Sequence, residues 1–304
     1  MPVGALLAVV AGAEVAEAEI DDFVERFRAE FAVAAEASAE SAADEPQILE
    51  AAGRTINYLK SGSAEGPPLV LVHGFGGDLN NWLFNQPALA ESHTVYALDL
   101  PGHGRSTKEV GAGDLAVLSE TLAAVLDALD IDQAHLVGHS LGGATVLALA
   151  LERPEQTASL TLISPAGLGP EINQGYVEGY VAAGRRKEMK GVLQMLFADP
   201  ELVSRDMVED VLKYKRLDGV EGALETIAAA AFPEGRQAVV LAERLSELAV
   251  PVQVIWGRRD EIVPPAHAEN LPPNVALHLI ENAGHMSHME AAGEVNRLIA
   301  AIAG

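Results

Sequence analysis

AHLVGHSLGGA, from Ala134 to Ala144, decides the fold class of this chain. An apolar, strand-like run at Ala134–Gly138 leads into a helix-like run at Leu141–Leu151. A sharp turn between such elements lifts a serine hydroxyl above a sheet, and flanking glycines remove side chains that would clash. The context predicts that Ser140 is a nucleophile; the alternative is a glycine-rich turn whose serine caps a helix. The pattern G-x-S-x-G is supplied by Gly138, His139, Ser140, Leu141 and Gly142.

Strand-like and helix-like segments alternate on both sides of this turn. Alternation on this scale predicts an α/β fold with a mostly parallel central sheet and helices on both faces. Helices are expected at Leu115–Leu129 and near the C-terminus at Val295–Ile302. The other expected strands are Gln47–Ala52, Thr55–Lys60, Pro68–Val72, Thr94–Leu98, Leu160–Ile163, Val252–Trp256 and Ala276–Ile280.

The alternation stops between Ser164 and about Val250, where only helix-like segments follow one another. A block of helices between two strands of one sheet indicates a cap over the site. We therefore expect a helical cap at about 165–248, inserted after the sixth strand. Its helices are expected at Tyr176–Ala183, Met189–Phe197, Met207–Tyr214 and Val220–Phe232.

A nucleophilic serine needs a base, and the base needs an orienting carboxylate. In this fold the chain order is serine, acid, histidine. Asp260 and His285 follow the last two strands in that order. Two alternatives stay open: Asp260 pairs with Arg258 or Arg259, or His288, which is expected to begin the last helix, replaces His285.

A second glycine-rich turn, His73–Gly77 (HGFGG), follows the expected strand Pro68–Val72. An oxyanion formed by acyl attack needs two donors, and the backbone N–H groups of Phe75 and Leu141 are the candidates. The alternative is a turn that merely ends a strand. His73 is expected to support its turn, and His103, in the compact turn DLPGHGRS, is expected to be structural rather than a metal ligand or base.

The composition excludes several classes of function. The chain has 304 residues, 49% of them hydrophobic, and no cysteine, which excludes disulfides and thiolate nucleophiles and fits a cytoplasmic protein. A net charge of -24 repels nucleic acid and anionic membranes. No apolar run reaches the ~18 residues of a membrane span. The motifs of zinc proteases, nucleotide-binding loops and dinucleotide folds are absent, so no metal site is expected.

Residues 1–46 form a separate leader. An apolar strand is expected at Val3–Val10, a helix from about Glu17, and a small, acidic linker at Ala37–Pro46. No lysine or arginine precedes the apolar stretch, which disfavours a signal peptide.

Eight of the 20 basic residues fall between Arg185 and Arg216, within the expected cap, and only six acids share that window. A solvated helix face is the favoured interpretation, and a docking patch for an anionic cofactor or an acidic partner is the alternative. These residues are Arg185, Arg186, Lys187, Lys190, Arg205, Lys213, Lys215 and Arg216.

From Gln47 to Gly304 the chain resembles the α/β-hydrolase family, through HGFGG, DLPGHGRS, GHSLGG and the late Asp and His loops. The resemblance implies a catalytic triad of Ser140, Asp260 and His285, with Phe75 and Leu141 as oxyanion donors.

A narrower resemblance is to the dihydrolipoamide acetyltransferase (E2) components of acetoin dehydrogenase complexes. It lies in HGFGGDLNNWLFN (His73–Asn85) and in Pro2–Val24, which is similar to the last strand and exit segment of a lipoyl domain. The lysine that would carry lipoate is absent, since Lys60 is the first lysine. We therefore interpret 1–46 as a lipoyl-domain remnant, left by cutting or by natural shortening, and 47–304 as the α/β-hydrolase domain.

The resemblance implies a serine-dependent acetyl transfer from dihydrolipoamide to coenzyme A, both as substrates, with no tightly bound cofactor. A lipoyl domain or other subunits of a 2-oxo-acid-dehydrogenase-type complex are the expected partners. The ordinary E2 motif H-x-x-x-D-G is absent, so transfer has to run through Ser140. The alternatives are a carboxylesterase or thioesterase, a C–C bond hydrolase, or a ligand-binding protein without turnover.

Overall fold

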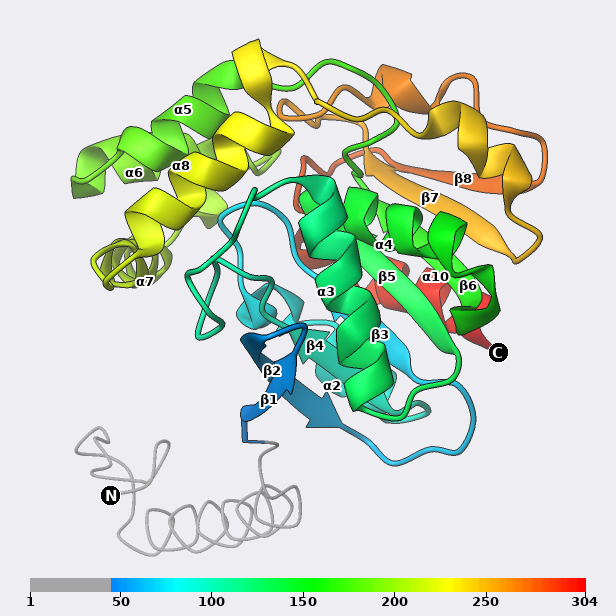
Figure 1. Cartoon of the computed structure of the whole chain (residues 1–304). Coiled ribbons are helices and arrows are strands. Elements are labelled where there is room, and N and C mark those ends of the chain that lie inside the picture. Colours follow the sequence, from blue (N-terminus) through cyan, green and yellow to red (C-terminus); the bar gives the residue numbers. More distant parts are fainter. Residues whose placement is uncertain (1–44) are drawn as a thin grey trace, which may run out of the picture. The chain divides into compact units, whose positions relative to one another are not determined.

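The computed structural model describes residues 45–304, so the leader's expected strand and helix lie outside the described residues. An eight-stranded sheet forms the centre, in the order β1-β2-β4-β3-β5-β6-β7-β8 (Figure 1). The first two strands form a hairpin and β2 is antiparallel to β4, whereas β3 to β8 run parallel, as the sequence predicts. The strands are β1 Gln47–Ala51, β2 Arg54–Ser61, β3 Leu69–Val72, β4 Val95–Leu98, β5 Ala134–His139, β6 Thr157–Ile163, β7 Val252–Gly257 and β8 Val275–Ile280.

Both faces of the sheet are buried because both are covered by helices. Side chains alternate along a strand, so Leu69 and Leu71 enter one core and Val70 and Val72 enter the other. The core around Val70 includes α3 and α4, and the core around Leu69 includes α2 and α10. These helices are α2 Gln86–Ala90, α3 Leu115–Ala128, α4 Leu141–Glu152 and α10 Ala292–Ala303.

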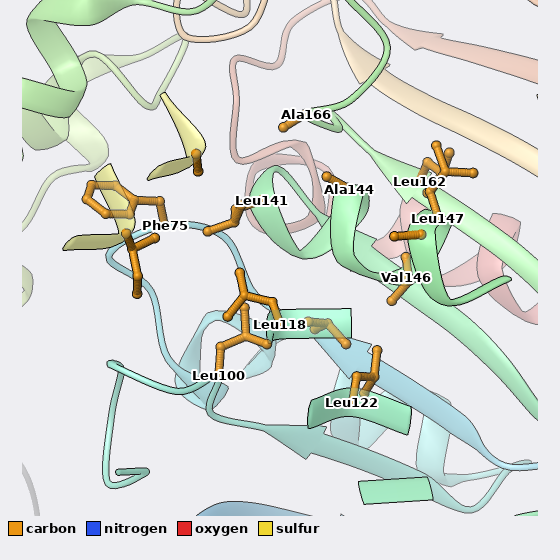
Figure 2. Close-up of a cluster of buried hydrophobic side chains, with 14 of the residues drawn as sticks. Phe75, Leu100, Leu118, Leu122, Leu141, Ala144, Val146, Leu147, Leu162 and Ala166 are labelled. Atoms are coloured by element: carbon orange, nitrogen blue, oxygen red, sulfur yellow. The ribbon is translucent and has the colours of Figure 1, made fainter. Parts of the chain in front are cut away.

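Helix α4 carries the predicted nucleophile at its N-terminus, and its packing sets where that end lies. Figure 2 shows Val146 and Leu147 of α4 together with Leu118 and Leu122 of α3 and Leu162 of β6 in one hydrophobic cluster. All five side chains are buried. This packing holds α4 against the sheet, with its N-terminus at the carboxyl end of β5.

The predicted cap is present between β6 and β7, and its helices gather at one side of the sheet (Figure 1). Polar side chains begin two of them: Asn173 accepts a hydrogen bond from the Tyr176 N–H, and Ser204 accepts one from the Met207 N–H. The cap helices are α5 Gln174–Ala182, α6 Arg186–Gln194, α7 Arg205–Lys215 and α8 Val220–Ala231.

The end of the chain differs from the sequence prediction. His288 does not begin the last helix, because it lies in a separate short helix, α9 Ser287–Glu290. Ala291, with φ of -128° and ψ of 42°, interrupts the helical backbone before α10. The break buries His288 completely rather than leaving it at an exposed helix start.

Candidate active site

Ser140 lies on the turn between β5 and α4, with φ of 54° and ψ of -119°. Such a backbone is rare for a residue with a side chain and marks a strained position. Glycine is required at the two flanking positions, 138 and 142, because a side chain there would clash with the backbone. A Cβ at Gly138 would lie 2.3 Å from the Gly142 carbonyl oxygen, and a Cβ at Gly142 would lie 2.3 Å from the Val72 carbonyl oxygen. The turn therefore has the geometry of a nucleophile elbow.

Asp260 and His285 meet although 25 residues separate them, because they follow the neighbouring parallel strands β7 and β8. His285 Nδ1 lies 2.8 Å from Asp260 Oδ2, and both side chains are almost fully buried. A carboxylate only accepts, so Nδ1 carries the proton and Nε2 is left as the basic nitrogen. The structure thus brings the predicted acid and base together.

The Asp260 carboxylate is held by four donors. Oδ1 accepts from the backbone N–H groups of Ile262 (2.8 Å) and Val263 (3.0 Å). Oδ2 accepts from Trp256 Nε1 (3.0 Å) and from His285. Four donors leave the carboxylate one orientation.

The alternative pairing of Asp260 with a neighbouring arginine does not occur. Arg258 instead forms an ion pair of 2.6 Å with Glu281, and Arg259 donates to the Asn282 side chain.

The turn Gly74–Gly77 is closed by a 3.1 Å hydrogen bond from the Gly77 N–H to the Gly74 carbonyl. His73 orients the same carbonyl. Its Nε2 accepts from the Leu100 N–H (3.0 Å), so its proton is on Nδ1, which donates to the Gly74 oxygen (2.8 Å). In a trans peptide the Phe75 N–H points opposite to that oxygen. Within residues 45–304 the N–H groups of Phe75 and Leu141 donate to no other group, so both remain available to a ligand.

Ser140, His285 and Phe75 line one cavity of about 90 Å³. The described residues hold no direct hydrogen bond between the Ser140 hydroxyl and His285, although both line this cavity. The rest of the lining is mostly apolar and comes largely from the cap. The lining residues are Gly74, Phe75, Gly76, Gly77, Asn81, His139, Ser140, Tyr176, Tyr180, Leu193, Leu196, Phe197, Met207, Val211, His285, Met286 and Met289.

The rival base His288 does not line the cavity. Its ring lies 4.7 Å from the Trp82 ring and 4.6 Å from the His139 ring, measured between centroids. Neither ring nitrogen has a partner among the described residues, and burial lowers the pKa of His288 to about 3. It therefore stays neutral and has no path to substrate, whereas His285 has both an acid partner and access.

His139 has a role that the sequence did not reveal. Its Nε2 donates to the His285 backbone carbonyl (3.0 Å), and the two rings lie 4.6 Å apart between centroids. Burial holds the pKa of His139 well below its usual range. A neutral histidine therefore supports the loop that carries His285.

Part of the basic cluster in the cap is engaged within the cap itself. Arg186 and Arg205 each lie 2.8 Å from Glu209, and Lys215 donates to carbonyls at the end of α5. Exposed pairs of this kind contribute little stability. For these residues the solvated or structural interpretation holds, and docking by the remaining basic residues stays a prediction.

Residues 45–304 contain no group of three or more histidine, cysteine, aspartate or glutamate side chains that could hold a metal ion. No helix in this part of the chain is long and apolar enough to cross a membrane.

Residues 67–292 match the alpha/beta hydrolase fold family. The chain therefore belongs to the α/β-hydrolase family and is an enzyme, which confirms the broad resemblance seen in the sequence.

The narrower resemblance is confirmed by two relatives. The dihydrolipoyllysine-residue acetyltransferase component of the acetoin cleaving system of Pseudomonas putida is 52% identical over 298 residues, which cover 98% of this chain and 79% of the relative. The component of the same name from Cupriavidus necator is 45% identical over 300 residues, which also cover 98% of this chain and 79% of the relative.

Hydrolases are more distant relatives. A 2-hydroxymuconate semialdehyde hydrolase from a Pseudomonas species is 34% identical over 263 residues, covering 82% of this chain and 90% of the relative. The solved structure of a meta-cleavage product hydrolase from Pseudomonas fluorescens matches with a TM-score of 0.75 and 26% identity, covering 83% of this chain and 95% of that chain.

Proposed function

We propose that the chain is a serine-dependent acetyltransferase that moves an acetyl group from a dihydrolipoamide thioester to coenzyme A, as a component of an acetoin-cleaving complex. The observation that carries this proposal is a cavity lined by Ser140, His285 and Phe75, with the Leu141 N–H, next to Ser140 in the chain, also free of other hydrogen bonds among the described residues. The names of the two relatives from Pseudomonas putida and Cupriavidus necator supply the donor and the complex.

In the proposed first half-reaction, Ser140 Oγ attacks the thioester carbonyl while His285 Nε2 takes the hydroxyl proton. Asp260 stabilises the imidazolium that results. The new oxyanion accepts hydrogen bonds from the Phe75 and Leu141 N–H groups. When the intermediate collapses, the carbon–sulfur bond breaks, the departing thiolate takes the proton from His285, and acetyl-Ser140 remains.

In the second half-reaction the thiol of coenzyme A replaces the departed thiol. His285 removes the thiol proton, the sulfur attacks the acetyl carbonyl through the same oxyanion site, and Ser140 leaves with the proton returned from His285. Atoms and protons balance without a metal or a redox cofactor.

The size of the cavity favours a short acyl group. Its volume of about 90 Å³ is smaller than the roughly 150 Å³ of a cavity that holds benzene. An acetyl group fits this space, whereas an aromatic ring does not fit without movement of the cap. Thioether side chains line part of the cavity, and their flexibility leaves some freedom for adjustment.

The second candidate is hydrolysis, in which water replaces the thiol acceptor. The 34% identical hydrolase relative favours it, because the same nucleophile, base and oxyanion donors serve both reactions. The acceptor is therefore the point that an experiment has to decide.

The deciding experiment supplies S-acetyldihydrolipoamide with and without coenzyme A to the wild-type chain and to Ser140→Ala. Acetyl-CoA that forms only in the wild-type sample supports the transferase. Acetate formed at the same rate with and without coenzyme A supports the hydrolase. Activity that survives in Ser140→Ala refutes both forms of the mechanism.

We also propose that residues 1–46 include the end of a lipoyl domain, which precedes the hydrolase domain 47–304. The similarity of Pro2–Val24 to a lipoyl exit segment supports this division. A lipoyl domain is then the natural carrier of the donor, and one can be supplied as a separate protein to test this. Faster acetyl transfer from an acetylated lipoyl domain than from free S-acetyldihydrolipoamide would support such a partner, and equal rates would count against it.

A further inference from the structure

Gly76, in the turn that carries the candidate oxyanion donor, is held on both sides. Its N–H donates to His103 Nε2 (3.1 Å), and its carbonyl accepts from the Tyr180 hydroxyl (2.6 Å). His103 belongs to the turn after β4, in the hydrolase core. Tyr180 belongs to α5, in the cap. The turn is therefore clasped between the core and the cap.

The Tyr180 ring packs directly against Gly76. Its ring is buried and lies 5.7 Å from the Phe75 ring, at 63° between the ring planes. A Cβ at Gly76 would lie 2.4 Å from Tyr180 Cζ, and Gly76 has a φ of 76° that favours glycine. The tyrosine ring thus occupies the space that the missing side chain leaves.

Both partners of Gly76 keep the protonation state that their hydrogen bonds need. Burial raises the pKa of Tyr180 well above its usual range, so the hydroxyl remains a donor. Burial also holds the pKa of His103 well below its usual range, and His103 Nδ1 donates to the Pro101 carbonyl, so Nε2 remains an acceptor.

Other residues of the cap hold Tyr180 in place. Lys215 Nζ, at the end of α7, donates to the carbonyls of Tyr180, Val181 and Ala183, the last two at 2.8 Å. The same ammonium group lies 5.5 Å from the centre of the Tyr180 ring. Tyr176, one helical turn earlier, adds a longer hydrogen bond of 3.4 Å to the Phe75 carbonyl. The C-terminal half of α5 is thereby tied to α7 at one end and to the Gly74–Gly77 turn at the other.

We propose that Tyr180 is a positioning residue of the cap, whose hydroxyl holds the Gly74–Gly77 turn so that the Phe75 N–H points into the cavity. The inference rests on the proposed acyl-transfer function, which gives that N–H its task. It follows that the turn is fully fixed only while the cap is seated on it, because His73 and the Gly77 N–H hold the Gly74 carbonyl from the core side and Tyr180 holds the Gly76 carbonyl from the cap side. With the cap open the Phe75 N–H is less precisely placed, so Ser140 reacts faster after closure, which also excludes water.

The test removes the Tyr180 hydroxyl and keeps its ring, with Tyr180→Phe in the full chain. We expect kcat for an acetyl thioester, per active site titrated with a fluorophosphonate, to fall about 10- to 100-fold. The fall is smaller than the ~10²–10³-fold cost of deleting an oxyanion donor outright, because the N–H is displaced rather than lost. We expect KM to change less than about threefold, because the ground-state carbonyl depends little on these donors.

Two further readouts separate positioning from a purely structural role. Inhibition by a trifluoromethyl ketone, which forms a tetrahedral adduct with the serine, is expected to weaken by the same factor as kcat, because it uses the same oxyanion donors. The pH dependence of kcat is expected to keep its midpoint, because His285 and Asp260 are untouched.

Tyr214→Phe is the matched control. The Tyr214 hydroxyl also donates to a glycine carbonyl at 2.6 Å, that of Gly102, and also joins the cap to the core, but it does not touch the Gly74–Gly77 turn. An equal loss of kcat in both variants would overturn the proposal, because general docking of the cap would then explain it. Unchanged kcat in Tyr180→Phe would overturn it as well. Activity that persists in Ser140→Ala would instead refute the proposed function itself.

Discussion

Asp260→Asn is the substitution that most sharply separates the proposed triad from a merely structural pair. The change replaces one carboxylate oxygen by an NH₂ group, which only donates. The backbone N–H groups of Ile262 and Val263 are fixed, so the remaining amide oxygen is expected to face them. The NH₂ group then faces His285 Nδ1, which has to become an acceptor, and the ring proton moves to Nε2.

This tautomer cannot take a proton from Ser140. We expect kcat to fall about 10⁴-fold, the cost seen when a triad aspartate is replaced by asparagine, which corresponds to about 5.5 kcal/mol in the activation free energy. At least one hydrogen bond to a charged acceptor is also lost, so the free energy of unfolding is expected to fall by about 1.5–3 kcal/mol. Trp256 Nε1 keeps a second acceptor in the Val263 carbonyl (3.3 Å), which limits the structural damage.

The assay is thioester turnover at pH 7 together with urea unfolding of the same samples. Folded Asp260→Asn with kcat within tenfold of the wild type would refute the reasoning, since the orientation of His285 would then not matter. Arg258→Gln is the control, because it removes an exposed ion pair with Glu281 beside the same loop and is expected to leave kcat unchanged.

Two further predictions concern stability. His288 is neutral in the folded chain with a pKa of about 3, against a usual 6.5, so below pH 6.5 the unfolded chain binds a proton that the folded chain does not. The contribution of neutral His288 to the free energy of unfolding is thus fully present above pH 6.5. It is lost as the pH falls, by about 2 kcal/mol at pH 5. Urea unfolding gives the free energy of unfolding at pH 7 and at pH 5. The loss of this free energy between the two pH values is expected to be about 2 kcal/mol smaller for His288→Phe than for the wild type, and equal losses would contradict the assignment. Gly142→Ala places a methyl group against two backbone carbonyls and is expected to destabilise by about 1–3 kcal/mol. Gly222 lies in α8, and a methyl group added there has nothing within 4 Å, so Gly222→Ala is expected to stabilise the fold by about 0.5–1 kcal/mol. Thermal unfolding measures both glycine variants. A Gly142→Ala variant more stable than Gly222→Ala would be inconsistent with the packing at Ser140.

Local patterns predicted much of the fold. The strand and helix that flank Ser140 follow from apolar runs and glycine spacing, and parallel pairing then places the Asp260 and His285 loops at one edge of the sheet. The order serine, acid, histidine therefore located all three side chains without any knowledge of their distances.

Contacts between distant segments were beyond the sequence. Nothing in the pattern of α5 distinguishes Tyr180 from a core tyrosine, because its partner, the Gly76 carbonyl, lies 104 residues away. The sequence left open whether Asp260 pairs with His285 or with a neighbouring arginine, because the actual partner of Arg258, Glu281, lies 23 residues away. His288 was misplaced because the helical pattern does not reveal the break at Ala291.

The central claim is that acetyl transfer passes through an ester on Ser140, and trapping that ester tests it most directly. The chain is mixed with S-acetyldihydrolipoamide without coenzyme A, quenched in acid, digested and mapped by mass spectrometry. We expect acetyl on the peptide that contains Ser140, and we expect coenzyme A, added before the quench, to remove it as acetyl-CoA. Acetyl-CoA formation with no acetyl on Ser140, or with acetyl on another residue, would contradict the account.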